Sequence, residues 1–119
     1  MAAWPVLQTG DVVWAPDPYH DDDPDLARGA GRPWLVVSTS AYPNQGADYI
    51  CCALTTSRRA GRGLVALGPG DWEFGGPSKP SKVDPRTILT LKHRWVDRRV
   101  GRLSPAKVAR VRASIRSYL

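Results

Sequence analysis

The sequence predicts a mainly β protein, in which short antiparallel strands form a small barrel and one C-terminal helix packs on it. Apolar residues occur in short runs that are rich in strand-forming residues. Glycines and prolines, eleven of each, separate those runs as turn residues do. A helical period occurs only at the end of the chain, after Ser104. The 119 residues suffice for one domain, residues 1–119, with a hydrophobic core of its own.

The first two predicted strands carry the residue around which we expect the site to form. Residues 10–15 are a turn followed by a strand, which two prolines end. Residues 34–37, Trp-Leu-Val-Val, are continuously apolar, which predicts a strand buried on both faces. Pro33 has no amide proton, so it belongs at the start of that strand or at a sheet edge. Arg32 therefore lies where a loop enters the core, with the scaffold on one side and solvent on the other.

Three further strands are predicted, at residues 49–54, 64–67 and 82–91. The turn residues 68–71 direct the chain back toward Trp72, Glu73 and Phe74. Pro85 predicts a sheet edge or an irregularity within the last strand, which we expect to continue through residues 92–96.

The C-terminal helix has the clearest pattern in the chain. Ser104 suits the N-cap and Pro105 the first helical position, and the spacing of Leu103 and Val108 predicts a hydrophobic staple. Apolar residues recurring every three to four positions predict one face that covers the sheet: Val108, Val111, Ile115 and Leu119.

The charge is unevenly distributed. Residues 1–30 carry six aspartates and one arginine, a net charge of −5, whereas residues 31–119 carry sixteen basic and five acidic residues, a net charge of +11. This imbalance predicts a nucleic acid as the partner, with a merely soluble basic protein as the other interpretation. The loop from Asp17 to Asp25 is either a solvated surface loop or a segment that competes with nucleic acid for a basic groove.

The composition also excludes several classes. There is no apolar run long enough to span a membrane and no signal-peptide pattern, so we expect a cytoplasmic protein. Cys51 and Cys52 are adjacent, and a bridge between neighbours would strain the peptide, so we expect free thiols. With no other cysteine and two isolated histidines, the sequence predicts no metal site and no cofactor.

Three stretches together resemble the MazF/PemK/Kid toxins, the mRNA interferases of toxin–antitoxin systems. Residues 10–14, Gly-Asp-Val-Val-Trp, are similar to the opening strand of that family. Residues 31–37, Gly-Arg-Pro-Trp-Leu-Val-Val, resemble its Gly-x-Arg-Pro strand, and residues 50–55 resemble the strand that ends in its active-site threonine. Residues 85–88 and 101–104 match two further motifs, and the order of all five along the chain makes the resemblance specific.

The resemblance implies an SH3-like small barrel of the CcdB/MazF/PemK type, a homodimer, and inhibition by a cognate antitoxin. It also implies metal-independent cleavage of single-stranded RNA at short preferred sequences. In that reaction the ribose 2′-hydroxyl attacks the adjacent phosphorus, which leaves a 2′,3′-cyclic phosphate and a 5′-hydroxyl.

The same resemblance predicts the catalytic residues Arg32, Thr55 and His20. Arg32 can present a forked donor to two phosphoryl oxygens, and the Thr55 hydroxyl can donate another hydrogen bond. We assign Arg32 to electrostatic stabilisation, because a guanidinium keeps its proton far above neutral pH. His20 is a candidate for proton transfer, since some family members use a histidine in the corresponding loop; the identity of the base stays open.

The predicted substrate-binding residues carry hydroxyls or charges and lie near the ends of two predicted strands: Thr56, Ser57, Arg58, Arg59, Lys82, Asp84 and Arg86. Asp84 stands one position from the place where some family members have an acidic residue, which here is Val83. Arg86 has a second interpretation as a structural partner of Asp11 or Asp97. His93 is either structural or a phosphate contact.

Two other functions fit the sequence. A DNA gyrase poison of the CcdB type has the same fold and acts through an aromatic and apolar pair at the C-terminus, where this chain has Tyr118 and Leu119. A non-catalytic basic barrel that binds nucleic acid would use the charge alone.

Overall fold

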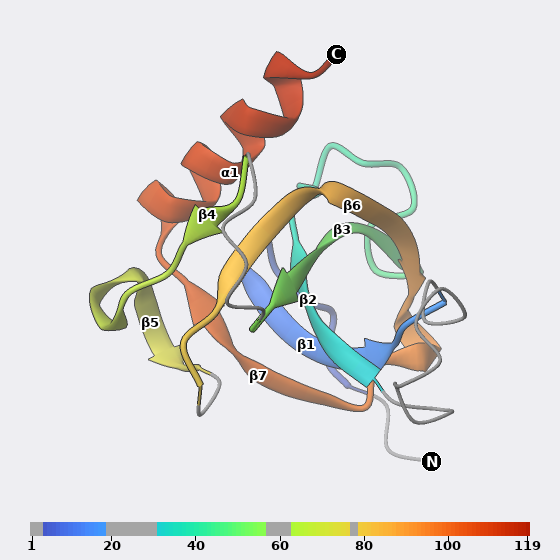
Figure 1. Ribbon diagram of the computed structural model, residues 1–119. Helices are drawn as coiled ribbons and strands as arrows, with labels where there is room; N and C mark the ends of the chain where they lie inside the picture. Colours follow the sequence, from blue (N-terminus) through green and yellow to red (C-terminus); the bar gives the residue numbers. More distant parts are fainter. Residues whose placement is uncertain (1–3, 19–30, 57–62, 77–78) are drawn as a thin grey trace.

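The computed structural model describes residues 4–18, 31–56, 63–76 and 79–119. Within them, seven strands form one curled antiparallel sheet in the order β4-β6-β3-β2-β1-β7-β5, and the C-terminal helix lies on its outer side (Figure 1). The elements are β1 (Asp11–Pro16), β2 (Gly31–Val36), β3 (Asp48–Thr55), β4 (Val65–Ala66), β5 (Trp72–Gly75), β6 (Lys82–Lys92), β7 (Arg98–Leu103) and α1 (Pro105–Ser117). The predicted small β barrel with a C-terminal helix is confirmed.

Strand β2 is buried on both faces, as its sequence predicts. Because successive side chains of a strand point to opposite faces, Trp34 and Val36 enter one apolar cluster while Leu35 and Val37 enter another. The first cluster, here called the inner core, fills the curl of the sheet. Its buried members are Leu7, Val13, Ala15, Trp34, Val36, Tyr49, Cys51, Ala53, Leu91 and Val96. The second cluster lies beneath α1 and includes Val108 and Val111 of that helix.

Strand β6 is interrupted where the sequence has Pro85. Cys52 of β3 pairs with Ile88, whereas the next residue, Ala53, pairs with Asp84, so residues 85–87 have no counterpart on β3. A proline cannot donate a ladder hydrogen bond, which explains why the irregularity falls there. The predicted irregularity is confirmed.

Helix α1 begins as predicted and ends before its last predicted apolar residue. The Ser104 hydroxyl accepts a hydrogen bond from the Lys107 amide at 3.3 Å, and Val108 and Val111 are buried. The helix ends at Ser117, so Leu119 lies beyond it and is 99% exposed. The prediction that Leu119 covers the sheet is wrong. In the described part of the chain, no helix has the length and apolar character that crossing a membrane requires.

The region between β6 and α1 differs from the prediction. Strand β6 includes Lys92 but ends there, because His93–Trp95 form a 3-10 turn, so the expected continuation through residues 93–96 is wrong. The chain then forms β7, which pairs with both β1 and β5 and was not predicted. Three arginines hide the apolar alternation of β7, and its Gly101 allows close approach to β5: a Cβ there would lie 2.6 Å from the Phe74 carbonyl oxygen.

One end of the inner core is sealed by the 3-10 turn and the segment at residues 4–8. The Tyr49 hydroxyl accepts a hydrogen bond from the Leu7 amide at 3.0 Å and lies 2.8 Å from His93 Nδ1. His93 Nε2 lies 2.6 Å from the Trp4 carbonyl oxygen. Because that oxygen can only accept, we assign the His93 proton to Nε2, and Nδ1 then accepts from Tyr49. His93 therefore has the structural position that was one of its two interpretations.

Candidate active site

The open end of the inner core brings together residues from three adjacent strands. Trp34 of β2 pairs with Ala53 of β3, and continuing that register by two residues brings Arg32 level with Thr55. Thr55 in turn pairs with Lys82 of β6. Directly opposite residues in an antiparallel pair share a face, with Cβ atoms about 4.5–5.5 Å apart. Arg32, Thr55 and Lys82 thus form one row at the rim of the barrel, called the rim row below.

Arg32 is held in place on several sides. Its Nε and Nη2 donate to the Leu54 carbonyl oxygen at 3.2 and 2.9 Å, and its Nη1 donates to Asp17 Oδ2 at 3.1 Å. The guanidinium carbon lies 5.7 Å from the centroid of the Trp34 ring. The Arg32 side chain is still 27% exposed. A fixed cation that remains accessible can receive an anionic ligand without first being ordered.

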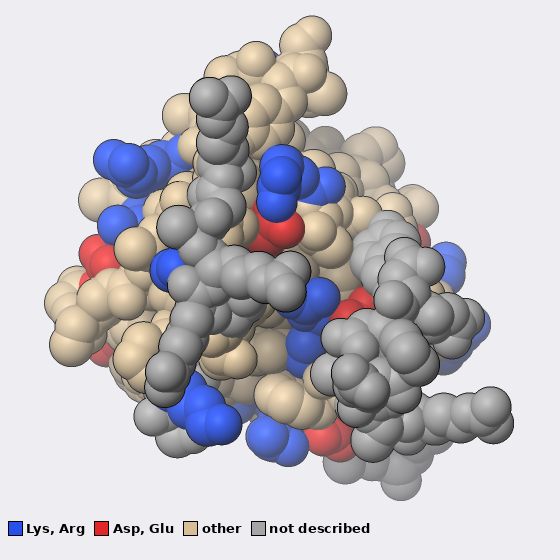
Figure 2. Space-filling view, viewed as in Figure 1, with Lys and Arg blue, Asp and Glu red and all other residues tan. Residues whose placement is uncertain are grey.

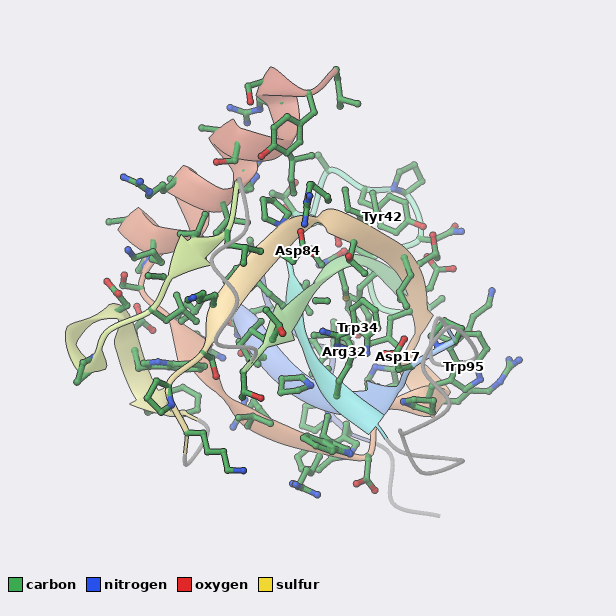
Figure 3. All side chains as sticks on the ribbon, in the orientation of Figure 1. Asp17, Arg32, Trp34, Tyr42, Asp84 and Trp95 are labelled. Atoms are coloured by element: carbon green, nitrogen blue, oxygen red, sulfur yellow. The ribbon has the colours of Figure 1, made fainter. Side chains whose placement is uncertain are left out.

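The contact with Leu54 also joins Arg32 to the residue next to Thr55. Leu54 is fully buried in β3, so the carbonyl that receives the guanidinium is part of the rigid sheet. The position of Arg32 near Thr55 is therefore fixed by its hydrogen bonds to Leu54 and by the pairing of Arg32 with Ala15 of β1. Figure 3 shows Arg32, Trp34 and Asp17 lying together within the curl of the sheet.

Asp17 also belongs to this site, although no local sequence motif indicates it. Ala15 of β1 pairs with Arg32, and Asp17 follows two residues later, on the same face if the strand continues. Its side chain is 6% exposed. The alternation of β1 extended past Pro16 is the signal that could have found it, but the run of aspartates from Asp17 to Asp25 favoured a solvated loop.

The remaining predicted residues near the rim row differ in exposure. Thr55 and Lys82 are half-buried, and Lys82 also pairs with Ala66 of the edge strand β4. Thr56 follows the end of β3 and is exposed. The predicted residues His20, Ser57, Arg58 and Arg59 lie outside the described residues.

Asp84 and Arg86 are partners of each other at the interruption of β6. Asp84 Oδ1 accepts from the Arg86 amide and from Arg86 Nε, both at 3.1 Å, and Asp84 Oδ2 accepts from the Thr87 hydroxyl at 3.0 Å. Burial raises the pKa of Asp84, but the hydrogen bonds from Arg86 and Thr87 outweigh it and hold the pKa below its usual range.

The expectation that Arg86 pairs with Asp11 or Asp97 is therefore wrong in its partners. The buried Asp11 accepts a hydrogen bond from Arg102 Nε at 2.7 Å, and the exposed Asp97 pairs with the neighbouring Arg98 at 3.4 Å. Arg86 pairs instead with Asp84, which stands two residues away in the sequence.

The two thiols are free, as predicted, and both are fully buried. Burial raises the pKa of Cys51 and raises the pKa of Cys52 to about 12. Neither is therefore a nucleophile near neutral pH. Across residues 4–18, 31–56, 63–76 and 79–119, no three histidine, cysteine or acidic side chains gather as they would to hold a metal ion.

The exposed face around the rim row is mixed in charge. Figure 2 shows Lys and Arg side chains spread over this face, with fewer Asp and Glu side chains among them. This distribution agrees with the net charge of +6.

A curled seven-stranded sheet with a C-terminal helix and a fixed arginine at its rim defines a small β-barrel protein with a partly exposed cation at one end. The family model described as PemK-like, MazF-like toxin of type II toxin–antitoxin system matches residues 8–119. The chain belongs to this family.

Among curated proteins, the chain is similar to endoribonuclease MazF1 of Mycobacterium bovis and endoribonuclease MazF4 of Mycobacterium tuberculosis. Each is 33% identical over 95 residues, which cover 80% of this chain and 84% of the relative.

Solved structures agree in fold. An endoribonuclease from Mycobacterial species, in complex with its cognate antitoxin, is 25% identical with a TM-score of 0.68, covering 93% of this chain and 92% of that chain. MazF from Deinococcus radiodurans is 20% identical with a TM-score of 0.70, covering 97% of each chain, and supports the fold alone.

Proposed function

We propose that the protein is a toxin endoribonuclease that cleaves single-stranded RNA in the cytoplasm and is neutralised by a cognate antitoxin. The observation that carries the proposal is the fixed, partly exposed Arg32 guanidinium, hydrogen-bonded to Leu54 beside Thr55. Membership of the toxin family and the curated endoribonucleases at 33% identity support it.

The reaction we propose is attack of the ribose 2′-hydroxyl on the adjacent phosphorus, which leaves a 2′,3′-cyclic phosphate and a 5′-hydroxyl. The transition state concentrates negative charge on the phosphoryl oxygens, and Arg32 stabilises that charge with its exposed N–H groups. The Thr55 hydroxyl donates a further hydrogen bond, and Lys82 binds a neighbouring phosphate of the same strand. The nucleophile belongs to the substrate, so the proposed reaction needs no metal ion.

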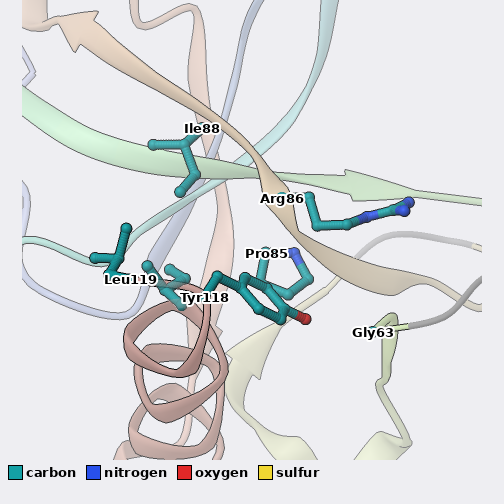
Figure 4. Close-up of a pocket in the computed structure, with 7 residues that line it drawn as sticks. Gly63, Pro85, Arg86, Ile88, Tyr118 and Leu119 are labelled. Carbon is teal, nitrogen blue, oxygen red and sulfur yellow. The ribbon is translucent and has the colours of Figure 1, made fainter.

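We further propose that the active form is a homodimer. Apolar side chains line a groove of about 470 Å³ between β6 and the end of α1 (Figure 4). Pro85, Ile88 and Ile115 contribute to it, and Tyr118 and Leu119 at its edge are 50% and 99% exposed. An exposed apolar surface of this kind suits a second copy of the chain.

Cleavage assays test the enzymatic proposal against its alternatives. The purified protein and Arg32→Ala are incubated with single-stranded RNA in EDTA, and the fragment ends are identified. Cleavage by the unaltered protein alone, with cyclic phosphate ends, supports the proposal. RNA binding without cleavage would support a binding barrel. Inhibition of DNA gyrase without cleavage would instead support a CcdB-type poison acting through Tyr118 and Leu119.

A further inference from the structure

We propose that Asp17 is the general base of this reaction, taking the proton of the attacking 2′-hydroxyl. The inference rests on the function proposed above and names a residue for the role that the sequence left open. It follows from the position of one nearly buried carboxylate against the guanidinium that binds the scissile phosphate.

The Asp17 carboxylate lies beside the place where Arg32 would bind the scissile phosphate. Asp17 Oδ2 lies 3.1 Å from Arg32 Nη1. A phosphate oxygen bound by the same guanidinium would lie about 2.7–2.9 Å from its nitrogens. The phosphate and the carboxylate are then neighbours on one cation, and the 2′-hydroxyl next to that phosphate comes within hydrogen-bond reach of Asp17.

The other candidate bases in the described part of the chain are placed differently. Asp84 is engaged by Arg86 and Thr87. His93 bonds to Tyr49 near the start of β3, whereas Thr55 ends that strand, and six residues of strand span about 20 Å.

In the described residues, Arg32 on β2 pairs with Asp17, and Lys82 on β6 is the other cation of the rim row. On β7, Arg98 lies opposite Trp14 of β1 and pairs with Asp97, and Arg99 lies opposite Val13.

The proposed step balances protons and charge. The O2′–P bond forms as the 2′ proton passes to the Asp17 carboxylate, and the P–O5′ bond breaks. The departing 5′ oxygen takes a proton from solvent water, and Asp17 later returns its proton to solvent. Asp17 becomes neutral as negative charge grows on the phosphoryl oxygens, so its repulsion of the phosphate falls in the transition state.

The test compares Asp17→Asn with His20→Gln in the full-length protein. The substrate is an RNA oligonucleotide that the unaltered protein cleaves, and its 2′-O-methyl analogue measures binding alone. We expect Asp17→Asn to lower kcat by about 10²–10⁴-fold. Its KM should be unchanged or lower, and its affinity for the analogue unchanged or higher, because a carboxylate near the phosphate has been removed.

The pH profile separates a base from a structural partner of Arg32. For the unaltered protein, kcat/KM should fall toward acid with unit slope, because a protonated carboxyl group cannot accept the 2′ proton. That limb should persist in His20→Gln and be lost in Asp17→Asn. Cleavage by Asp17→Asn within ten-fold of the unaltered protein would overturn the inference, as would an acid limb lost only in His20→Gln.

These outcomes are distinguishable from failure of the proposed function. One outcome is that the unaltered protein and Asp17→Asn both cleave RNA whereas Arg32→Ala does not. The proposed function then stands, and only the role of Asp17 is overturned. If the unaltered protein does not cleave RNA under any of these conditions, the proposed function fails and this inference fails with it.

Discussion

The two ends of the inner core differ in how exposed their polar groups are. At the end where β3 begins, the fully buried Tyr49 bonds to Leu7 and His93 through neutral hydrogen bonds. At the end where β3 finishes, Arg32 bonds to a carbonyl and a carboxylate and stays 27% exposed. Polar groups paired inside the chain stabilise the fold, whereas a charge left within reach of solvent is available to a ligand.

The two ends also differ in whether a ligand can replace one partner of a hydrogen bond. The hydrogen bonds at the sealed end tie the segment at residues 4–8 to the barrel, including Trp4 Nε1 to the Asp97 carbonyl at 3.1 Å. At the open end, the Asp17 carboxylate holds a guanidinium nitrogen that a phosphate can also use. Substitutions at the sealed end should therefore change stability, and substitutions in the rim row should change activity.

Among the substitutions that compare the two ends of the inner core, Arg32→Ala should have the largest effect on activity. Removing the donors that face the phosphoryl oxygens should lower kcat by about 10²–10³-fold or more. Arg32→Lys keeps the charge and loses the fork, so we expect it to recover only part of the rate. Single-turnover cleavage of an RNA oligonucleotide measures both.

Thermal unfolding is the control for both arginine variants. Arg32 lies near the start of β2 and is 27% exposed, so we expect the folded structure to survive the loss of this side chain. Unfolding of Arg32→Ala at the assay temperature would contradict the assignment of Arg32 to function rather than to stability.

Tyr49→Phe should produce the converse result at the sealed end. It removes the hydroxyl that accepts from the Leu7 amide and donates to His93 Nδ1, which leaves buried polar groups unpaired. We expect the free energy of unfolding to fall by about 1–3 kcal/mol, measured by urea denaturation. Cleavage per folded molecule should be unchanged, and a loss of kcat at full stability would break the division between the two ends.

Asp84→Asn tests whether every charge near the rim row belongs to the site. Asp84 accepts hydrogen bonds from Arg86 and Thr87, which hold its pKa below the usual range although burial raises it. A group whose pKa is lower in the folded state stabilises the protein above its unfolded pKa, about 3.9. That stability is lost as the pH falls through the folded pKa.

The variant should therefore be less stable by about 1–2 kcal/mol at pH 7, with a difference that shrinks below about pH 4. Urea denaturation at pH 7, 5 and 3 measures this trend. If Asp84 and Arg86 form a purely structural pair, the folded variant should cleave RNA at nearly the same rate as the unaltered protein. Normal stability with a large loss of cleavage would instead place Asp84 in the site.

The sequence predicts the strands that carry apolar runs better than those that carry charge. The continuous run at Trp34 and the capped helix after Ser104 were predicted because one local pattern determines each element. Strand β7 was missed because its arginines mask the alternation, and its pairing with β1 and β5 lies far away in the sequence. Leu119 was misassigned because periodicity does not reveal where a helix ends.

The rim row could be predicted only in part for the same reason. Arg32 and Thr55 are visible from the ends of their predicted strands, and the resemblance to a toxin family adds their roles. The contact between Arg32 and Asp17 depends on the pairing of β1 with β2, which no local pattern specifies. The partner of Arg86 could have been found from sequence distance alone, since Asp84 stands two residues away.

Lys82→Ala should have the smallest effect, and Lys92→Ala is its matched control at the other end of the same strand. Lys82 lies in the rim row, whereas Lys92 pairs with Asp48 at 3.7 Å near the sealed end. If Lys82 binds one phosphate, its removal should lower the slope of log affinity against log salt by about 0.7, with KM raised several-fold and kcat kept. Lys92→Ala should leave that slope unchanged. Equal slopes for both variants would show that the rim row ends at Thr55, and that RNA leaves the barrel without passing β6.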